Sequence, residues 1–187
     1  VAWRHQYCGL FWARWNDCTY YFIDNEYYFK RGTLYGHYDD AERFAFFARA
    51  VLEIIPHLDW KPDIIHCNDW QSALTPLYYS IYYANQIGYE NIKTVFTIHN
   101  IQYQGKYGNE LLNDVLGIAP EYNNLILYDG LVNFMKAGIE CANKVTTVSP
   151  TYAKEILDPW FSHGLDPILN QRSWKLCGIL NGIDVEN

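Results

Sequence analysis

Carboxylate, imidazole and amide side chains stand directly after short apolar runs in this sequence, where they could form one polar site. A carboxylate or an imidazole can move protons or bind hydroxyl groups, and an amide binds hydroxyl groups without carrying charge. The set favours a small polar substrate, and none of its members is an obvious covalent nucleophile. The residues are Asp69, His99, Asn100 and Asn181.

The runs before these residues have the pattern of buried strands. They are short, contain many β-branched residues and are separated by helical patterns, which predicts parallel strands joined by βαβ crossovers. Ligands of such sheets bind beyond the carboxyl ends of the strands, so we expect the polar residues to lie along one edge. The predicted strands cover residues 62–66, 93–98, 144–148 and 177–180.

Helical patterns occupy the intervals between the predicted strands. Asp39 and Glu42 form a capping-box pattern, which predicts a helix that begins there and ends before Pro56. Its apolar stripe predicts the face that packs against the core. The stripe consists of Phe44, Phe47, Ala48, Val51 and Ile55.

Three further helices have local signals. Thr75 and Pro76 predict the N-cap and first residue of one helix, and Ser149 and Pro150 those of another. An apolar stripe across residues 131–142 predicts the third.

Two other segments have simpler patterns. Residues 19–23 predict a strand, with a turn at Asp24 and Asn25. Residues 105–124 show no clear period, so we expect a loop with short helical pieces there.

Composition limits the function. With 187 residues, of which 50% are hydrophobic and 19% charged, the chain fits one folded domain. A net charge of −7 and the absence of a Lys/Arg run argue against nucleic-acid binding, and no apolar run is long enough to cross a membrane. Five cysteines without a C-x-x-C pair predict reduced thiols in a cytoplasm, not a disulfide framework.

Motifs for phosphate binding are also missing. The sequence contains neither G-x-G-x-x-G nor G-x-x-x-x-G-K-[ST], and a diphosphate needs cations, a metal or a glycine-rich turn. If the substrate is a nucleotide sugar, its phosphates must be held mostly by groups outside this chain. The 18% aromatic content suits stacking against sugar rings, but an aromatic-rich core explains it equally well.

Each candidate residue has a structural alternative. Asp69 could cap a helix, and a histidine at a strand end, such as His99, is more often a hydrogen-bonded structural residue than a catalyst. Cys67 could pair with His99, although a packed thiol is favoured. Together with His66 these residues lack the fixed spacing of a metal site, so no metal and no other cofactor is expected.

Six stretches of the chain, in order, resemble the bacterial glycogen synthases and plant starch synthases that use ADP-glucose. Together they cover nearly the whole chain, and no single stretch would suffice. They are residues 21–31, 34–36 with 40–44, 62–71 (PDIIHCNDWQ), 93–105 (KTVFTIHNIQYQG), 136–142 with 145–152 (VTTVSPTY) and 178–184 (GILNGID).

The resemblance implies the GT-B architecture, in which two Rossmann-like domains face each other across a cleft. Residues 1–187 would then be most of the amino-terminal domain. The extreme amino terminus with its K-x-G-G-L loop, and the whole C-terminal domain, would be absent. The chain stops at residues 184–187, just after a predicted strand, which also indicates a fragment. The missing C-terminal domain is the expected partner.

The resemblance also implies an activity. The chain would be part of a retaining glucosyltransferase that transfers glucose from ADP-glucose to the non-reducing end of an α-1,4-glucan, and the fragment alone would be inactive. A bacterial cytoplasm is favoured over a plastid. The alternatives are another GT-B glycosyltransferase and a non-catalytic glucan-binding module. The absence of G-x-G-x-x-G argues against an NAD-dependent oxidoreductase.

Two residues are expected to be catalytic by this resemblance. Asp69 matches the family aspartate near the reaction centre. His99 matches the histidine that contacts the transferred glucose and whose backbone carbonyl lies near the anomeric carbon, where its dipole can stabilise positive charge. Asn68 stands where many members have a second histidine.

Four residues are expected to bind substrate by the same resemblance. Asn100 and Asn181 match contacts to sugar hydroxyl groups. Phe29 and Arg31 fall in a stretch associated with the glucan acceptor, although solvation at the surface explains Arg31 equally well.

Overall fold

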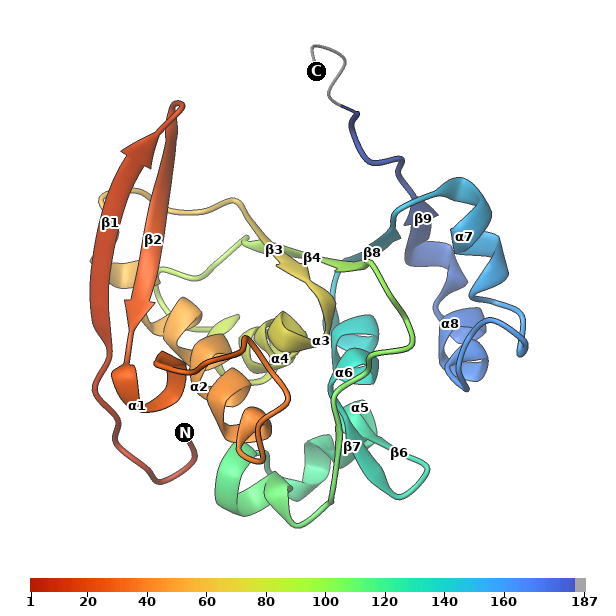
Figure 1. Ribbon diagram of the computed structural model, residues 1–187, viewed down its shortest axis with the longest axis horizontal. Coiled ribbons are helices and arrows are strands. Elements are labelled where there is room, and N and C mark those ends of the chain that lie inside the picture. The colour runs from red at the N-terminus through yellow and green to blue at the C-terminus, as the bar shows by residue number, and fades with distance from the viewer. Residues whose placement is uncertain (184–187) are drawn as a thin grey trace.

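The structure is a computed structural model that describes residues 1–183. Its centre is a four-stranded sheet in which every neighbouring pair of strands is parallel (Figure 1). This confirms the predicted α/β fold. The chain end at 184–187, including Asp184 of the last family-like stretch, lies outside the described residues. In spatial order the strands are β3 (Ile64–Asn68), β4 (Lys93–Ile98), β8 (Lys144–Thr147) and β9 (Leu176–Gly178).

The strands follow one another across the sheet in chain order. Parallel crossovers are right-handed, so a chain that always moves in one direction places its connecting helices on one face. Figure 1 shows α4 and α6 beneath the sheet, together with α2. The bounds are α2 (Asp40–Glu53), α3 (Asp69–Ser72), α4 (Leu74–Tyr78) and α6 (Phe134–Cys141).

The core lies between the sheet and these helices. Phe96 and Ile98 of β4 are fully buried. On β3, Ile65 and Cys67 are buried, whereas the residues that alternate with them are exposed. The sheet therefore packs one face against helices through its period-two pattern.

A row of polar side chains crosses the opposite face of the sheet. His66 Nε2 lies 2.6 Å from Thr97 Oγ1, which lies 2.6 Å from Thr146 Oγ1. These residues alternate along their strands with core residues such as Phe96 and Val145. The row thus links three neighbouring strands through side chains as well as backbone.

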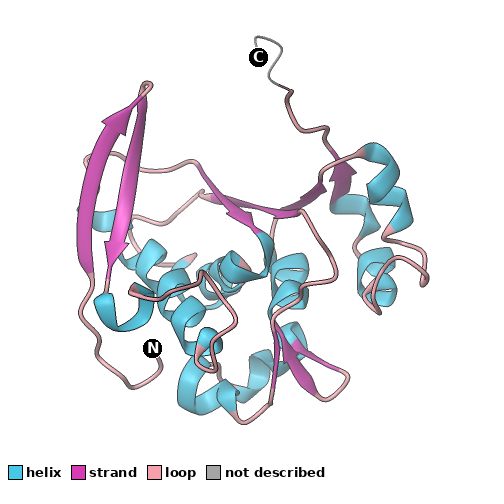
Figure 2. Ribbon diagram, viewed as in Figure 1, coloured by secondary structure: helices cyan, strands magenta, loops and turns pink. Residues whose placement is uncertain are grey.

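A hairpin stands beside the sheet (Figure 2). Its strands β1 (Gly9–Trp15) and β2 (Cys18–Asp24) are antiparallel, and Asn16 and Asp17 form its turn with φ values of 48° and 59°. The strand predicted at 19–23 is confirmed. The turn predicted at Asp24 and Asn25 is wrong, because Asp24 pairs with Gly9 and the Asn25 side chain caps α1 (Glu26–Phe29).

Helix α2 confirms the predicted helix, and its buried face overlaps the predicted stripe only in part, at Ala48 and at Ile55 just beyond its end. Phe44, Phe47 and Val51 are only half buried, and Asp39 makes no capping hydrogen bond, so the predicted capping box does not form. The helix contacts α3 and α4 on one side. On the other side its residues Phe46 and Ala50 pack against Tyr28 of α1. The positions buried in the main core are Ala41, Ala45, Ala48 and Leu52.

Two predicted helix starts differ from the structure and one agrees. The helical segment after β3 begins at Asp69, so Thr75 and Pro76 lie inside α4. Leu131 belongs to a strand, and α6 begins after Asn133. Helix α7 (Pro150–Glu155) begins as predicted, with Ser149 Oγ accepting a hydrogen bond from the Tyr152 N–H at 2.8 Å.

The remaining elements are short. The segment predicted as a loop contains a π-helical turn (Leu112–Leu116) and a 3-10 turn (Pro120–Tyr122), as expected, followed by α5 (Asn123–Ile126). A small antiparallel sheet was not predicted. No helix of the described chain is both long and apolar enough to span a bilayer. The strands of this small sheet are, in spatial order, β5 (Lys106–Tyr107), β7 (Leu131–Asn133) and β6 (Leu127–Tyr128). The remaining elements are the π-helical turn Tyr79–Tyr83, the 3-10 turns Ile55–His57 and Ser173–Lys175, and α8 (Asp166–Gln171).

Candidate functional site

A single carboxylate joins the ends of two neighbouring strands. Asp69 follows β3, and its Oδ1 accepts hydrogen bonds from the backbone N–H groups of His99 at 2.8 Å and Asn100 at 3.4 Å. The two donors follow β4, the parallel neighbour of β3. The structure therefore brings Asp69, His99 and Asn100 together at one edge of the sheet, while their roles stay a prediction.

The backbone of Asp69 is in an uncommon conformation. Its φ is 56°, in the left-handed region that residues with a Cβ rarely adopt. No side chain caps the start of α3, so the alternative that Asp69 acts as an N-cap is wrong. Such strained residues persist where the surroundings fix them, and they cluster at functional sites.

The His99 side chain has one fixed partner. Its Nε2 lies 2.9 Å from Oδ1 of Asn68, the last residue of β3. Whether Nε2 donates a hydrogen bond in this contact depends on the tautomer of the ring. Since His99 is exposed, the contact holds the imidazole in place and leaves it accessible to a ligand.

A cleft opens beside these strand ends. It has a volume of about 290 Å³, and its lining includes Asp69, Asn100, Tyr35 and Tyr103. Trp70 forms an edge-to-face pair with Tyr35, with ring centroids 6.2 Å apart. Tyr35 and Tyr103 are both about half exposed, at 48% and 52%, so the cleft offers aromatic faces and hydrogen-bonding groups together.

A second cavity continues from this cleft toward α1. It measures about 450 Å³, and Tyr35 and Gln71 line both spaces. Phe29 and Arg31, the residues predicted for the acceptor side, line the second cavity. The two spaces are therefore adjacent, and together they are here called the strand-end groove, with Asp69 at one end and Phe29 at the other.

Arg31 is fixed, and solvation alone does not describe it. Its Nη2 donates to Asp39 Oδ2 at 2.6 Å and to the Tyr27 carbonyl at 2.9 Å. The side chain is 21% exposed. Arg31 therefore forms a charged wall of defined position in the groove.

Asn181 lies apart from the other candidates. It is exposed in the segment after β9, two strands away from β4 in the sheet order. Among the described hydrogen bonds none joins it to Asp69, His99 or Asn100. Its role as a sugar contact stays a prediction.

Cys67 is a packed thiol, as the sequence favoured. Burial raises the pKa of this thiol to about 12, and Thr75 is its hydrogen-bond partner. No thiol–imidazole pair with His99 is present among the described contacts. Residues 1–183 contain no group of three His, Cys, Asp or Glu side chains arranged to hold a metal ion.

The sequence did not reveal all residues of the groove. Tyr35 and Tyr103 stand in the family-like stretches 34–36 and 93–105, but no local pattern marked either of them as a residue that lines a cleft. Gln71 comes two residues after Asp69 and could have been found from that neighbourhood. A third cavity of the described chain lies elsewhere and shares no lining residue with the groove.

Comparison with known proteins now gives the family. A family model for the starch synthase catalytic domain matches residues 1–171. Glycogen synthase from Exiguobacterium sibiricum is 52% identical, with 98% of this chain and 39% of that protein covered. Glycogen synthase from Desulfitobacterium hafniense is also 52% identical, with 98% and 40% covered. The chain thus spans about two fifths of these relatives.

A solved structure shows the same fold. It is the catalytic domain of Starch Synthase IV from Arabidopsis thaliana bound to ADP and acarbose, with a TM-score of 0.85 and 37% identity over 96% of this chain and 38% of that chain. This match confirms the predicted Rossmann-like fold of GT-B type. The sequence, the parallel sheet and all three comparisons agree: the chain belongs to the starch synthase catalytic domain family.

Proposed function

We propose that this chain is most of the amino-terminal domain of a retaining glucosyltransferase, which transfers glucose from ADP-glucose to the non-reducing end of an α-1,4-glucan. Relatives at about 50% identity are glycogen synthases, and the solved relative has ADP and acarbose bound. A second Rossmann-like domain of the same polypeptide completes the cleft in this proposal. The proposed location is a bacterial cytoplasm.

One observation carries this proposal. The Asp69 carboxylate holds the backbone amides of His99 and Asn100 at the mouth of the strand-end groove. Oδ2 of Asp69 accepts no hydrogen bond from the described residues, so it is available to a hydroxyl group. Exposed tyrosines along the groove suit glucose rings, because an aromatic face stacks on the apolar face of a sugar.

The proposed roles follow from these positions. The His99 imidazole contacts the transferred glucose, and the carbonyl dipole of the same residue stabilises the positive charge that develops at the anomeric carbon. Asp69 fixes that loop and supplies negative charge beside it. Asn100 and Asn181 bind sugar hydroxyl groups. This division assigns chemistry to backbone geometry as much as to side chains.

The acceptor glucan is proposed to lie along the second half of the groove. Phe29 offers an apolar surface there, and Arg31 is held by Asp39 as a fixed hydrogen-bond donor. No Lys or Arg lines the cleft at Asp69. We therefore assign the diphosphate of the donor mainly to the second domain, whose cations would face this edge.

The test is transfer of labelled glucose from ADP-glucose to glycogen. We expect the full-length polypeptide to incorporate label and the 187-residue chain alone to incorporate none, because the groups that bind the diphosphate are missing. Incorporation of label by the chain alone would contradict the proposal that the second domain binds the diphosphate of the donor. Efficient use of a different sugar donor would identify another GT-B transferase.

A non-catalytic glucan-binding role makes a different prediction for the same samples. The full-length polypeptide would then be retained on glycogen but would incorporate no label from any nucleotide sugar. Affinity electrophoresis in glycogen, run beside the transfer assay, separates the two functions. Retention together with transfer supports the enzyme.

A further inference from the structure

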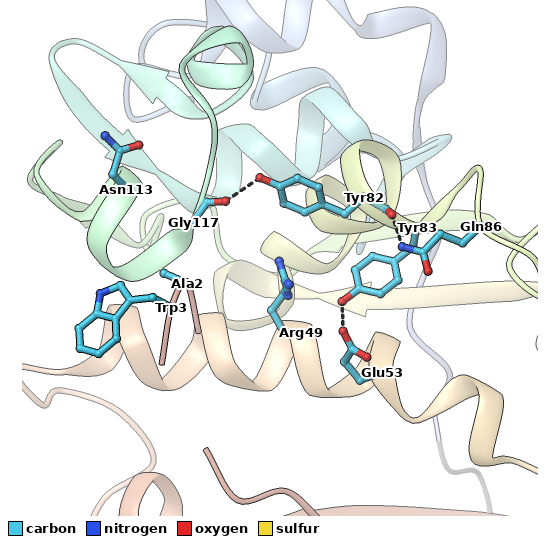
Figure 3. Close-up of a pocket in the computed structure, with 9 residues that line it drawn as sticks. All are labelled: Ala2, Trp3, Arg49, Glu53, Tyr82, Tyr83, Gln86, Asn113 and Gly117. Atoms are coloured by element: carbon cyan, nitrogen blue, oxygen red, sulfur yellow. Dashed lines mark hydrogen bonds between the residues drawn. The ribbon is translucent and has the colours of Figure 1, made fainter. Parts of the chain in front are cut away.

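A separate cavity of the described chain lies away from the strand-end groove. It has a volume of about 630 Å³. Helix α2 forms one side, and the first residues of the chain, the π-helical turn Tyr79–Tyr83 and the turn at Gly117 form the others (Figure 3). We call this space the Arg49 pocket, and neither the proposed transfer reaction nor the family resemblance uses it.

Arg49 projects from α2 into the middle of this pocket (Figure 3). Its guanidinium carbon lies 5.1 Å from the ring centroid of Tyr78, 5.3 Å from that of Tyr82 and 5.8 Å from that of Tyr83. Attraction between a cation and aromatic faces holds the guanidinium in place. The rings thus fix the charge but use none of its N–H donors in conventional hydrogen bonds.

Arg49 differs from every other arginine of the chain. Each of the other arginines forms an ion pair with a carboxylate, whereas Arg49 forms no ion pair and no side-chain hydrogen bond among residues 1–183. A planar guanidinium with open donors and a fixed orientation is suited to an oxyanion. The paired arginines are Arg4, Arg14, Arg31, Arg43 and Arg172.

Hydrogen bonds hold the walls of the pocket. Tyr82 donates its hydroxyl to the Gly117 carbonyl at 2.6 Å, and the Tyr83 hydroxyl donates to Glu53. Trp3 donates its indole N–H to Asp114 at 2.9 Å, and its side chain is 70% exposed. The pocket therefore has a preformed shape with one open aromatic surface.

The other polar groups suit hydroxyl groups better than a second charge. Asn113 is exposed in the lining, and Glu53 has one carboxylate oxygen that is not used by Tyr83. Glu53 also lines the pocket and adds a negative charge to the space that Arg49 faces. A bare anion is therefore held weakly, and the body of the ligand must add contacts.

We propose that the Arg49 pocket binds a sugar phosphate. The phosphate accepts hydrogen bonds from the Arg49 guanidinium, and the sugar hydroxyl groups meet Asn113 and the free oxygen of Glu53. The apolar face of the sugar ring lies on Trp3, as sugar rings do on aromatic side chains. This site is separate from the strand-end groove, because the two share no residue.

Calorimetric titration of the full-length polypeptide tests this assignment, with glucose 6-phosphate as the probe. We expect saturable binding that weakens about tenfold or more in Arg49→Gln, the usual cost of losing a charged hydrogen-bond partner. Arg14→Gln is the matched control, since Arg14 lies on the hairpin and is 68% exposed. Its affinity should equal that of the unmodified protein.

Two further probes separate the parts of the ligand. Glucose and inorganic phosphate should each bind at least about tenfold more weakly than glucose 6-phosphate, since each lacks one set of contacts. Equal binding of glucose and glucose 6-phosphate would overturn the proposal, because it would show that the guanidinium contributes nothing. Absence of binding by glucose 6-phosphate would overturn it as well.

A second variant covers the case in which Arg49→Gln does not fold. Asn113→Asp changes an exposed residue and adds negative charge to the lining, so it should weaken binding about as much. Asn109→Asp, an exposed residue outside the lining, is its control. Equal affinity in the two variants would contradict the assignment. All these readouts are binding constants, so they stand or fall independently of glucose transfer.

Discussion

The strand-end groove and the Arg49 pocket organise their polar groups in opposite ways. In the groove, one carboxylate holds the backbone amides of two residues on a neighbouring loop. In the pocket, one cation on a helix lies over three aromatic rings. The groove therefore depends on the conformation of loops, whereas the pocket depends on side chains attached to rigid helical segments. We therefore expect a single substitution in the groove to cause a large loss of catalysis. A single substitution in the pocket should cause a smaller loss of binding.

The largest expected effect follows from removing the Asp69 carboxylate. Asp69→Ala removes both hydrogen bonds to the loop. It also leaves an alanine in the left-handed region, where no side-chain hydrogen bond offsets the strain of that backbone conformation. We expect the turnover of the full-length polypeptide to fall about a thousandfold, the upper range for losing one preorganised polar group. Steady-state glucose transfer, measured on folded protein, checks this.

Asp69→Asn is the matched variant. Asn tolerates the left-handed region, and its amide oxygen can still accept from the two N–H groups, so stability should change little while the charge is lost. We therefore expect a large fall in kcat and little change in the melting temperature. If Asp69→Asn were fully active, Asp69 would act only through loop geometry.

His99 tests whether side chain or backbone matters more in the groove. His99→Ala removes the imidazole but keeps the carbonyl, so the loss should equal one polar contact made in the transition state, about 2–4 kcal/mol in kcat/KM. Parallel determination of kcat and KM is the measurement. An unchanged rate would show that the imidazole does not reach the sugar.

Asn68 sharpens the same point through pH. Asn68→Asp places a carboxylate where Oδ1 now lies 2.9 Å from His99 Nε2, and a nearby negative charge raises the pKa of an imidazole. We expect the added charge to favour the protonated imidazole, so the acid limb of the activity profile should move to higher pH. NMR titration of His99 and the pH profile of kcat are the measurements. A moved pKa with an unmoved profile would separate imidazole charge from catalysis.

The smallest expected effect concerns the tyrosines around Arg49. Burial and then the hydrogen bond to Glu53 raise the pKa of Tyr83 above its usual value of 10.0, and burial raises that of Tyr78. The folded state therefore keeps protons that the unfolded chain releases, so this contribution is complete below pH 10.0 and is lost as the pH rises further. The lowered pKa values of Lys136 and Lys175 act in the opposite direction.

Urea unfolding at a neutral and an alkaline pH measures this term. The free energy of unfolding should fall less steeply above pH 10.0 in Tyr83→Phe than in the unmodified chain, by less than about 1 kcal/mol per pH unit. Tyr103→Phe, half exposed at 52%, is the control. If the free energy of unfolding changed equally steeply with pH in all three proteins, the Tyr83 hydroxyl would not be the group that loses its proton.

The groove was partly predictable from sequence, because order along the chain determines which strand ends are neighbours. Asp69, His99 and Asn100 were expected at one edge, and the structure has them there. Their hydrogen bonds were not predictable, since they depend on the φ of Asp69, which no composition pattern records. Helix α2 was found by its pattern, but its buried face was only partly right: Ala48 and Ile55 are in the core, whereas Phe47 and Val51 are only half buried.

The Arg49 pocket was invisible for a different reason. In the sequence Arg49 is an ordinary charged residue of an amphipathic helix, and the tyrosines that surround it come about 30 residues later, as Tyr78 to Tyr83. Strands and loops were expected in residues 1–29, but the bounds of β1 were not predicted, although Asn16 and Asp17 carry the signal of a tight hairpin turn. Local signals of this kind can be read, whereas contacts between distant segments need the fold.

The polar row on the open face of the sheet has a consequence for how the chain reaches its fold. Thr97 touches both His66 and Thr146, so a slip of one residue along β4 would break both contacts and turn Thr97 toward the helices. The correct and the shifted register of these three parallel strands thus differ in their side-chain hydrogen bonds as well as in the burial of their apolar residues. The row therefore adds side-chain hydrogen bonds to the free-energy difference that favours the correct register.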